Sequence, residues 1–302
     1  MVITVLLLLA ILHEKTAAVS WKSKKHFIGN DAWADEHLSL CDSPKPRNNN
    51  ESCYTHVINY QRLNTEVINK DPILLILHGF IPSQYVDELL AETRKMEMEM
   101  GKVLSDSRAQ SEPYYDNARR ANGTAIDHEE TAAVAKVFRR AQAMMPFINF
   151  QSSEMWQIIS YQDNGHFAPH DDYVEFVHEN IRYGRFATFQ FLLQRAQEGG
   201  GTVFPNLETT VMPTPGDVVF WTNIDVNRKA TPGTLHGGCP VWEGEKVAAV
   251  KWILTAEQNE QDVFQSAHGD GTFDIEKLIH PGQYYYTKAK TYGKCKAMQS
   301  ST

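Results

Sequence analysis

The sequence predicts an α+β fold in which an antiparallel β-sandwich or barrel carries helices on one side. Two observations lead to this prediction: short apolar runs separated by Gly, Pro and Asn fill the chain from about residue 155, and two amphipathic helical patterns precede them. The 302 residues, 42% of them hydrophobic, suit one large or two smaller globular domains. The apolar runs are 155–161, 186–193, 202–205, 209–213, 217–221 and 247–254.

The elements before the sheet follow from periodicity. Residues 72–80 form a short apolar run that is typical of a strand. Apolar residues recur at helical spacing over 81–100, with Ser83 as the expected N-cap, and again over 129–145. We interpret both stripes as core packing against one side of the sheet.

Four parts are expected along the chain: a signal peptide 1–18, a polar N-terminal segment 19–70, a main domain 71–256 and a tail 257–302. The segment up to about residue 70 is rich in Asn, Lys and His, so we expect loops there. The polar tail shows one hint of a short helix, at 274–282, which a proline ends.

The first twenty residues, MVITVLLLLAILHEKTAAVS, contain an apolar run that is too short to span a bilayer but typical of a signal peptide. A buried N-terminal helix is the alternative. Sequons at Asn50 and Asn122 fit a secretory route and are the expected glycosylation sites. A net charge of −8 without a Lys/Arg-rich run argues against a nucleic-acid partner, and no later stretch is apolar enough to cross a membrane.

On a secretory route the four cysteines are expected to form disulfides. Cys41 and Cys53 enclose a polar loop, which a bridge between them would close. Cys239 and Cys295 remain, and a bridge between these two would tie the tail back to the body.

The stretch 166-HFAPHDDYV-174 holds two histidines and two aspartates. Pro169 argues against a helix, so His166 and His170 are not the helical pair of a zinc motif. In a strand, side chains alternate, and His170 and Asp172 then emerge on one face while Asp171 points the other way. One imidazole and one carboxylate can therefore reach a single ion, although an exposed ion pair is the alternative.

A second histidine would complete a 2-His-1-carboxylate triad, which leaves coordination positions open and favours non-haem Fe(II). His236 precedes the last clear strand and can supply it if that strand lies beside the first. Lys246 shares the face of 246–254 that is otherwise apolar, so it should point inward. A buried lysine needs an anion, unless it snorkels outward. An open iron site with a cation behind it suggests 2-oxoglutarate as cosubstrate.

Residues 72 to about 256 resemble the catalytic domain of the prolyl 4-hydroxylase family, the iron- and 2-oxoglutarate-dependent dioxygenases that modify collagen-like proline. The matching blocks, in order, are YQDNGHFAPHDDY, RFATFQFLL, GGGTVFP, PGDVVFW and LHGGCPVWEGEKVAAVKW. The resemblance implies a double-stranded β-helix, a jelly-roll variant, with flanking helices. It also implies hydroxylation of peptidyl proline with O2, release of succinate and CO2, and a need for ascorbate.

The resemblance also assigns roles to residues of this chain. It implies that His170, Asp172 and His236 are the iron ligands. It implies that Lys246 anchors the distal carboxylate of 2-oxoglutarate. Tyr161 and Thr188 then supply hydroxyls to the same carboxylate, and Trp252 lies in the pocket wall. The disulfide pattern of the family implies the same two cysteine pairs as above.

Phe167 departs from the family, which usually has a tyrosine there, close to the substrate proline. A hydroxylase of another residue type is therefore an alternative function. Rivals from other classes are a non-catalytic binding module of the same fold and, more weakly, a zinc hydrolase. The C-terminal MQSST lacks a retention signal, so residence in the endoplasmic reticulum lumen would need a partner. In this family that partner is protein disulfide isomerase; secretion is the alternative.

Overall fold

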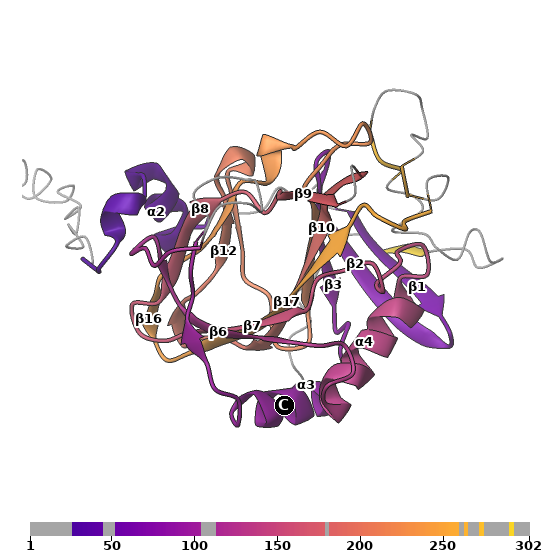
Figure 1. Cartoon of the computed structure of the whole chain (residues 1–302), viewed down its shortest axis with the longest axis horizontal. Helices are drawn as coiled ribbons and strands as arrows, with labels where there is room; N and C mark the ends of the chain where they lie inside the picture. The colour runs from indigo at the N-terminus through magenta and orange to yellow at the C-terminus, as the bar shows by residue number, and fades with distance from the viewer. Residues whose placement is uncertain are drawn as a thin grey trace, which may run out of the picture.

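Two antiparallel sheets face each other in the computed structural model, which describes residues 26–44, 52–103, 113–178, 181–259, 263–264, 272–274 and 290–292 (Figure 1). The larger sheet contains, in spatial order, β18 (Lys290–Tyr292), β1 (Ser52–Ile58), β2 (Gln61–Lys70), β3 (Ile73–His78), β14 (Val218–Thr222), β10 (Ile181–Gln194), β17 (Lys246–Leu254), β7 (Trp156–Tyr161), β6 (Asn122–Ile126) and β4 (Glu99–Met100), with β9 (Glu175–His178) beside β10. The smaller sheet contains β13 (Thr209–Val211), β12 (Thr202–Phe204), β15 (His236–Gly238), β8 (His166–His170) and β5 (Arg119–Arg120). A separate pair joins β11 (Glu198–Gly199) to β16 (Val241–Glu243).

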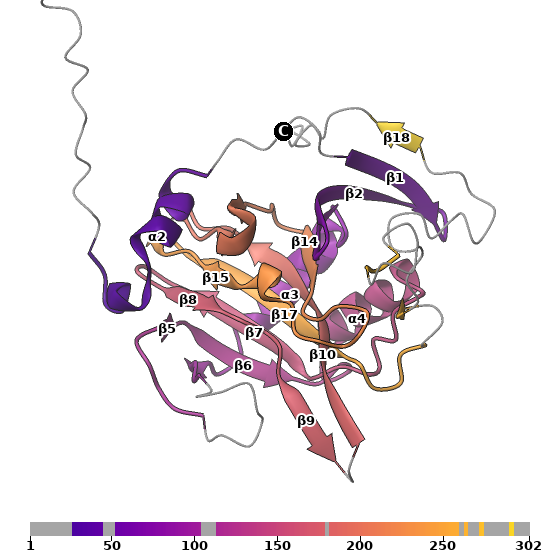
Figure 2. The same ribbon diagram turned by 90° about the horizontal axis from the view of Figure 1, so that it is seen from above.

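The chain crosses repeatedly from one sheet to the other. β7, β10, β14 and β17 belong to the larger sheet, and β8, β12 and β15, which lie between them in sequence, belong to the smaller one. Every described strand pairing is antiparallel. This alternation is the double-stranded β-helix, so the predicted fold class is confirmed. The β9–β10 hairpin extends beyond the body of the two sheets (Figure 2).

Period-two patterning decides which side chains enter the space between the sheets. In β17, Val247, Ala249 and Ile253 pack in the large core under the helices. Val250, on the opposite face, packs with Tyr161 and Ile159 between the sheets. The prediction that Lys246 points inward is therefore correct, because it shares the face of Val250 and is buried.

Two helices, α3 (Ser83–Thr93) and α4 (Ala132–Met144), cover the outer face of the larger sheet (Figure 1). Thr131 caps α4 by accepting a hydrogen bond from the amide of Val134. The prediction of Ser83 as an N-cap is wrong, since Ser83 is already helical and Pro82 precedes it. No helix among the described residues combines the length and apolar character needed to cross a membrane.

The expectation of loops before residue 70 is also wrong. The short helices η1 (Asn30–Ala32) and α2 (Asp35–Asp42) are followed by the β1–β2 hairpin. The many polar residues of β2 made this segment look like a loop in the sequence. Its buried face consists of every second residue, Leu63, Thr65 and Val67. Two further short helices, η2 (Pro205–Leu207) and η3 (Pro232–Thr234), precede β13 and β15. The leader, the sequon at Asn50 and most of the predicted 274–282 helix lie outside the described residues, whereas Asn122 is a half-buried residue of β6.

The disulfide pairing differs from the prediction. Cys41, in α2, is bonded to Cys239, with Cα atoms 5.7 Å apart. Both sulfur-bearing side chains belong to a small cluster in which Leu40 of α2 packs near Val203 of the smaller sheet. Closeness in sequence favoured Cys53 as the partner of Cys41, but the packing of α2 on the smaller sheet places Cys41 against Cys239. Cys53 is itself disulfide-bonded, and Cys295 lies outside the described residues.

Removal of this bond is expected to lower stability markedly. The bridge closes a loop of 198 residues, and a loop of that size restricts the unfolded chain strongly. The double variant Cys41→Ser/Cys239→Ser should lose roughly 2–5 kcal/mol of unfolding free energy. Urea denaturation followed by circular dichroism measures the change; a midpoint equal to that of the wild type would contradict the expectation.

His78 gives the fold a pH dependence. At the end of β3, its Nε2 lies 2.7 Å from the Glu66 carboxylate and its Nδ1 lies 3.5 Å from that of Asp217. Burial alone would lower the pKa of His78, but the two carboxylates outweigh it and raise the pKa to about 9. Because the unfolded value is 6.5, this stabilisation is complete below pH 6.5 and is lost as the pH rises to about 9.

Replacing His78 by glutamine should remove this dependence. We expect the difference in unfolding free energy between wild type and His78→Gln to shrink by roughly 3 kcal/mol between pH 6 and pH 9.5, at about 1.4 kcal/mol for each pKa unit. Burial lowers the pKa of Lys251 to about 7, so above pH 7 this residue makes the fold more stable as the pH rises, opposite to His78. Both proteins contain Lys251, so its contribution cancels in the difference between them. A difference that does not vary with pH would refute the assignment.

Candidate metal centre

The strands β8 and β15 bring two distant histidines together. In their antiparallel register His170 lies directly opposite His236. The neighbouring Gly237 permits this approach, since a Cβ there would come within 3.0 Å of the Phe167 carbonyl oxygen. The sequence predicts that the strand 247–254 lies beside the strand of His170, but 247–254 belongs to β17, which pairs with β7 and β10. His236 instead lies in the separate short strand β15, and β15 is the strand that pairs with β8.

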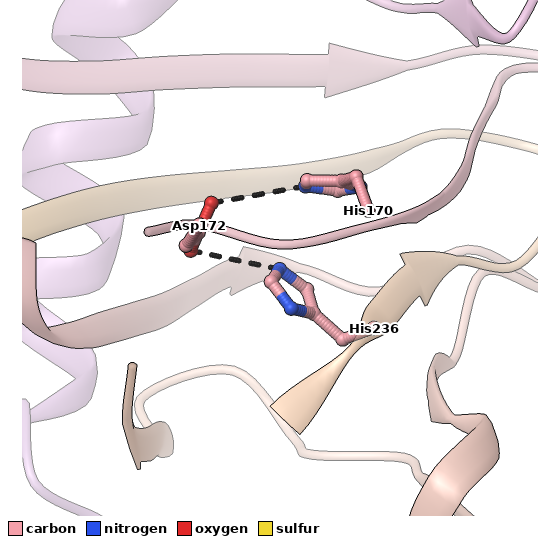
Figure 3. A group of neighbouring side chains, drawn as sticks. All are labelled: His170, Asp172 and His236. Carbon is pink, nitrogen blue, oxygen red and sulfur yellow. Dashed lines mark ion pairs between the residues drawn. The ribbon is translucent and has the colours of Figure 1, made fainter. Parts of the chain in front are cut away.

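Asp172, just beyond β8, completes the group (Figure 3). Its Oδ1 lies 3.7 Å from His170 Nε2 and its Oδ2 lies 3.5 Å from His236 Nε2. One ligand atom from each of the three residues lies within 4.8 Å of the others. His166 stays apart, because its Nε2 faces the carbonyl of Asn117 at 2.9 Å.

Hydrogen bonds select the metal-binding nitrogen of each histidine. His170 Nδ1 lies 2.9 Å from the Ala168 carbonyl, and His236 Nδ1 lies 2.9 Å from the Thr234 carbonyl. A carbonyl only accepts, so each Nδ1 carries the proton and each Nε2 offers a lone pair toward Asp172. Burial and the neighbouring His236 lower the pKa of His170, which favours the neutral form that binds metals. Two imidazoles and one carboxylate form the donor set typical of non-haem Fe(II).

Thr188 holds the carboxylate in place. Its hydroxyl donates to Asp172 Oδ2 at 2.7 Å and accepts from Asn223 Nδ2 at 3.0 Å. The contact of this hydroxyl is thus with the carboxylate of the metal group, where Thr188 lies opposite Trp252 across β10 and β17. A hydroxyl contact from Thr188 to the distal carboxylate of 2-oxoglutarate stays a prediction.

Thr188→Val should weaken metal binding without removing a ligand. Loss of a hydrogen bond to a metal-ligating carboxylate typically costs about 10–100-fold in metal affinity. Titration with Co²⁺ under anaerobic conditions measures it. Thr222→Val is the matched control, since the buried Thr222 hydroxyl has no hydrogen-bond partner among the residues that the structure describes. Equal affinities of the two variants would contradict the role of Thr188.

Lys246 lies in the same interior as the metal group. The side chain is 3% exposed, and its ammonium donates to Thr202 Oγ1 at 3.3 Å. It pairs across β17 and β7 with Tyr161, whose ring centroid is 5.5 Å from Nζ. No Asp or Glu among the described residues forms an ion pair with it, and burial lowers its pKa to about 8. The ammonium is still mostly protonated at neutral pH and can therefore receive a buried anion.

Two polar residues of this interior were missed from the sequence. The Thr202 hydroxyl donates to Gln190 Oε1 at 2.8 Å, and both side chains are buried. Gln190 lies two residues beyond Thr188 in β10, so strand alternation could have placed it on the inward face. Thr202 follows three glycines, and its run is too short to show a period.

A cavity of about 630 Å³ opens over the metal group, and Trp252 lies in its wall as predicted. The Arg185 guanidinium stacks on the Trp252 ring at 3.6 Å and pairs with Glu154 through two contacts of 2.5 and 2.9 Å. The Phe167 ring stacks on the His170 imidazole at 3.6 Å. The cavity thus presents aromatic faces and guanidinium groups directly beside the candidate metal.

Comparisons with known proteins agree with this chemistry. Residues 156–254, which hold all three candidate ligands and Lys246, match the model of the 2OG-Fe(II) oxygenase superfamily. Prolyl 4-hydroxylase subunit alpha-1 of Caenorhabditis elegans is 33% identical over 151 residues, covering 48% of this chain and 26% of that protein. Probable prolyl 4-hydroxylase 6 of Arabidopsis thaliana is 29% identical over 202 residues, covering 60% of this chain and 69% of that protein.

A solved structure is also similar. The viral collagen prolyl hydroxylase of Paramecium Bursaria Chlorella virus-1 matches with a TM-score of 0.47 and 23% identity. The match covers 60% of this chain and 95% of the viral one. The matched part of this chain spans about a quarter of the Caenorhabditis elegans subunit named above.

Proposed function

We propose that this chain hydroxylates proline residues of polypeptides, with Fe(II) and 2-oxoglutarate as cofactor and cosubstrate, because residues 156–254 match the 2OG-Fe(II) oxygenase model and the similar proteins include prolyl 4-hydroxylases. The observation that carries the proposal is the group of His170, Asp172 and His236 in one interior with the buried Lys246, which has no ion-pair partner in the described part of the chain. A metal site with open coordination positions can bind one end of a chelating dianion, and a separate buried cation can bind the carboxylate at its other end.

Different residues of the chain bind the metal, the cosubstrate and the substrate. The two Nε2 atoms and the Asp172 carboxylate hold the iron, and Thr188 orients the carboxylate. Lys246 binds the distal carboxylate of 2-oxoglutarate, with the Tyr161 ring and the Thr202 hydroxyl nearby. Fe(II), 2-oxoglutarate and O2 together supply the oxidising power to hydroxylate an unactivated carbon, with release of succinate and CO2. The cavity walls hold the substrate over the metal and exclude water.

The biological setting forms part of the proposal. The apolar leader, the two sequons and the even number of cysteines support synthesis on the secretory route, with the endoplasmic reticulum lumen as the site of action. Collagen-like or other proline-rich secretory chains would be the substrates. Protein disulfide isomerase would be the retaining partner, and ascorbate would restore iron that has become oxidised.

The test is release of labelled CO2 from 14C-labelled 2-oxoglutarate by the purified protein, with and without a (Pro-Pro-Gly) repeat peptide. A matched (Ala-Ala-Gly) peptide is the control. We expect stimulation by the proline peptide alone, with one added oxygen atom on proline in mass spectra. No stimulation by several proline-rich peptides would refute the proposal. Oxygen on another residue would favour the alternative that Phe167 raises, since its ring offers no hydroxyl over the metal.

A further inference from the structure

One cation in the cavity, Arg119, is only partly exposed and has no anionic partner among the described residues. Arg119, in β5, lies opposite Phe167 of β8, and its guanidinium carbon is 4.8 Å from the centroid of the Phe167 ring. That ring stacks on the ligand imidazole of His170. Arg119 therefore lines the cavity one ring away from the metal group.

The hydrogen bonds of Arg119 are incomplete. One terminal nitrogen donates to the Lys102 carbonyl at 2.8 Å, but the buried Nε has no hydrogen-bond partner within the described ranges. No carboxylate among the described residues forms an ion pair with it, and Asp172 attracts it only from a greater distance. Arg185, in the same cavity, differs because Glu154 neutralises it.

Arg119 is half-buried, and a guanidinium whose Nε is buried without a hydrogen-bond partner is unfavourable unless a ligand supplies that partner. Guanidinium stays charged at all physiological pH values, and its planar fork matches a carboxylate. The other unpaired charges of the cavity, on Lys102, Asp116 and Asp171, are exposed and thus screened by water. Arg119 is therefore the charged group of this cavity that can recognise a ligand specifically, and the ligand group that it would bind is negative.

We propose that Arg119 binds a carboxylate of the substrate, so that the preferred substrates carry an aspartate or glutamate next to the residue that is hydroxylated. This inference rests on the proposed function and refines its substrate class. A C-terminal carboxylate directly after that residue has the same chemistry, and the two sources can be separated by experiment.

Four proline-rich peptides test the proposal: C-terminally amidated forms with Asp, Asn or Lys beside one proline, and a free-acid form that ends at that proline. Fluorescence anisotropy without O2 gives their affinities, and 2-oxoglutarate turnover gives their KM. A charge-assisted hydrogen bond predicts about 10–100-fold tighter binding of a carboxylate peptide than of the Asn peptide. Preference for the Asp peptide identifies a side chain as the source, and preference for the free acid identifies the terminus.

Variants locate the effect. Arg119→Gln should abolish the preference, so that the carboxylate peptide binds no more tightly than the Asn peptide, whereas Arg119→Lys should keep part of it. Arg120→Gln is the matched control, because Arg120 is the next residue of β5 and lines a different cavity. Thermal melting confirms that each variant is folded. A purely structural role would weaken all four peptides equally.

The possible failures are distinct. If every proline peptide stimulates turnover and binds equally well, or if Arg119→Gln keeps the preference, the proposal is overturned and the hydroxylase function stands. If no peptide stimulates turnover, the hydroxylase function fails, and the binding data alone decide: a carboxylate preference lost in Arg119→Gln supports the role, and no preference overturns it.

Discussion

Asp172→Asn is expected to remove metal binding and all peptide-dependent turnover of 2-oxoglutarate. The Asp172 carboxylate lies between the Nε2 atoms of both histidines and is the only anionic donor of the group. An amide is a neutral and much weaker donor for Fe(II). Loss of a hydrogen bond to a metal ligand lowers metal affinity by about 10–100-fold. Loss of the charge of the ligand itself should therefore lower metal affinity by more than about 100-fold. Anaerobic titration with Fe²⁺ or Co²⁺ measures it.

The neighbouring carboxylate provides the control. Asp171 has the same charge and lies one residue away, but it is exposed and is not part of the metal group. Asp171→Asn should therefore retain metal affinity within a small factor. Similar losses in both variants would indicate a general charge effect instead of coordination, and retention of full affinity by Asp172→Asn would remove the basis of the metal site.

Lys246→Met should raise the apparent KM for 2-oxoglutarate by a factor of about 30 or more. Truncation of one partner of a buried charge pair typically costs roughly 2–5 kcal/mol of binding. Because Lys246 acts on the distal end of the cosubstrate, kcat at saturation should change much less. Steady-state decarboxylation over a range of 2-oxoglutarate concentrations gives both constants. A large fall in kcat at unchanged KM would contradict the anchoring role.

Lys251 offers a control in the same strand. It is fully buried, like Lys246, but it faces the helices and contacts His128 at 2.8 Å. Lys251→Met removes an equally buried cation from the opposite face of β17. The KM for 2-oxoglutarate should remain unchanged in that variant, while the unfolding free energy is free to change. A raised KM in both variants would point to distortion of β17 as the cause.

Most of the metal centre could be predicted from the sequence because strand alternation is a strict rule. The rule placed His170 with Asp172 and turned Lys246 inward, and the structure agrees on all three. Alternation fixes the face of a residue but not its neighbours across the sheet. The role of Thr188 beside the distal carboxylate came from the resemblance, and alternation alone could not predict that its hydroxyl contacts Asp172.

The errors in the N-terminal part have a different cause. β1 and β2 lie toward one edge of the larger sheet and carry many polar residues, so their sequence resembles that of a loop. The few buried residues of β2 form too short a pattern to reveal a strand. Arg119 was not singled out at all. Its two-residue strand has no period, and only pairing with β8 places it over Phe167.

The link between Cys41 and Cys239 has a consequence for biosynthesis. The ribosome releases Cys41 and Cys53 early and close together, while Cys239 emerges after nearly two hundred more residues. Short loops close more readily than long ones, so an oxidising compartment favours the wrong partner first. Maturation would then depend on thiol exchange, which needs a thiolate to attack the premature bond. Newly made chains should accumulate as an incorrectly bridged species wherever a disulfide isomerase is lacking.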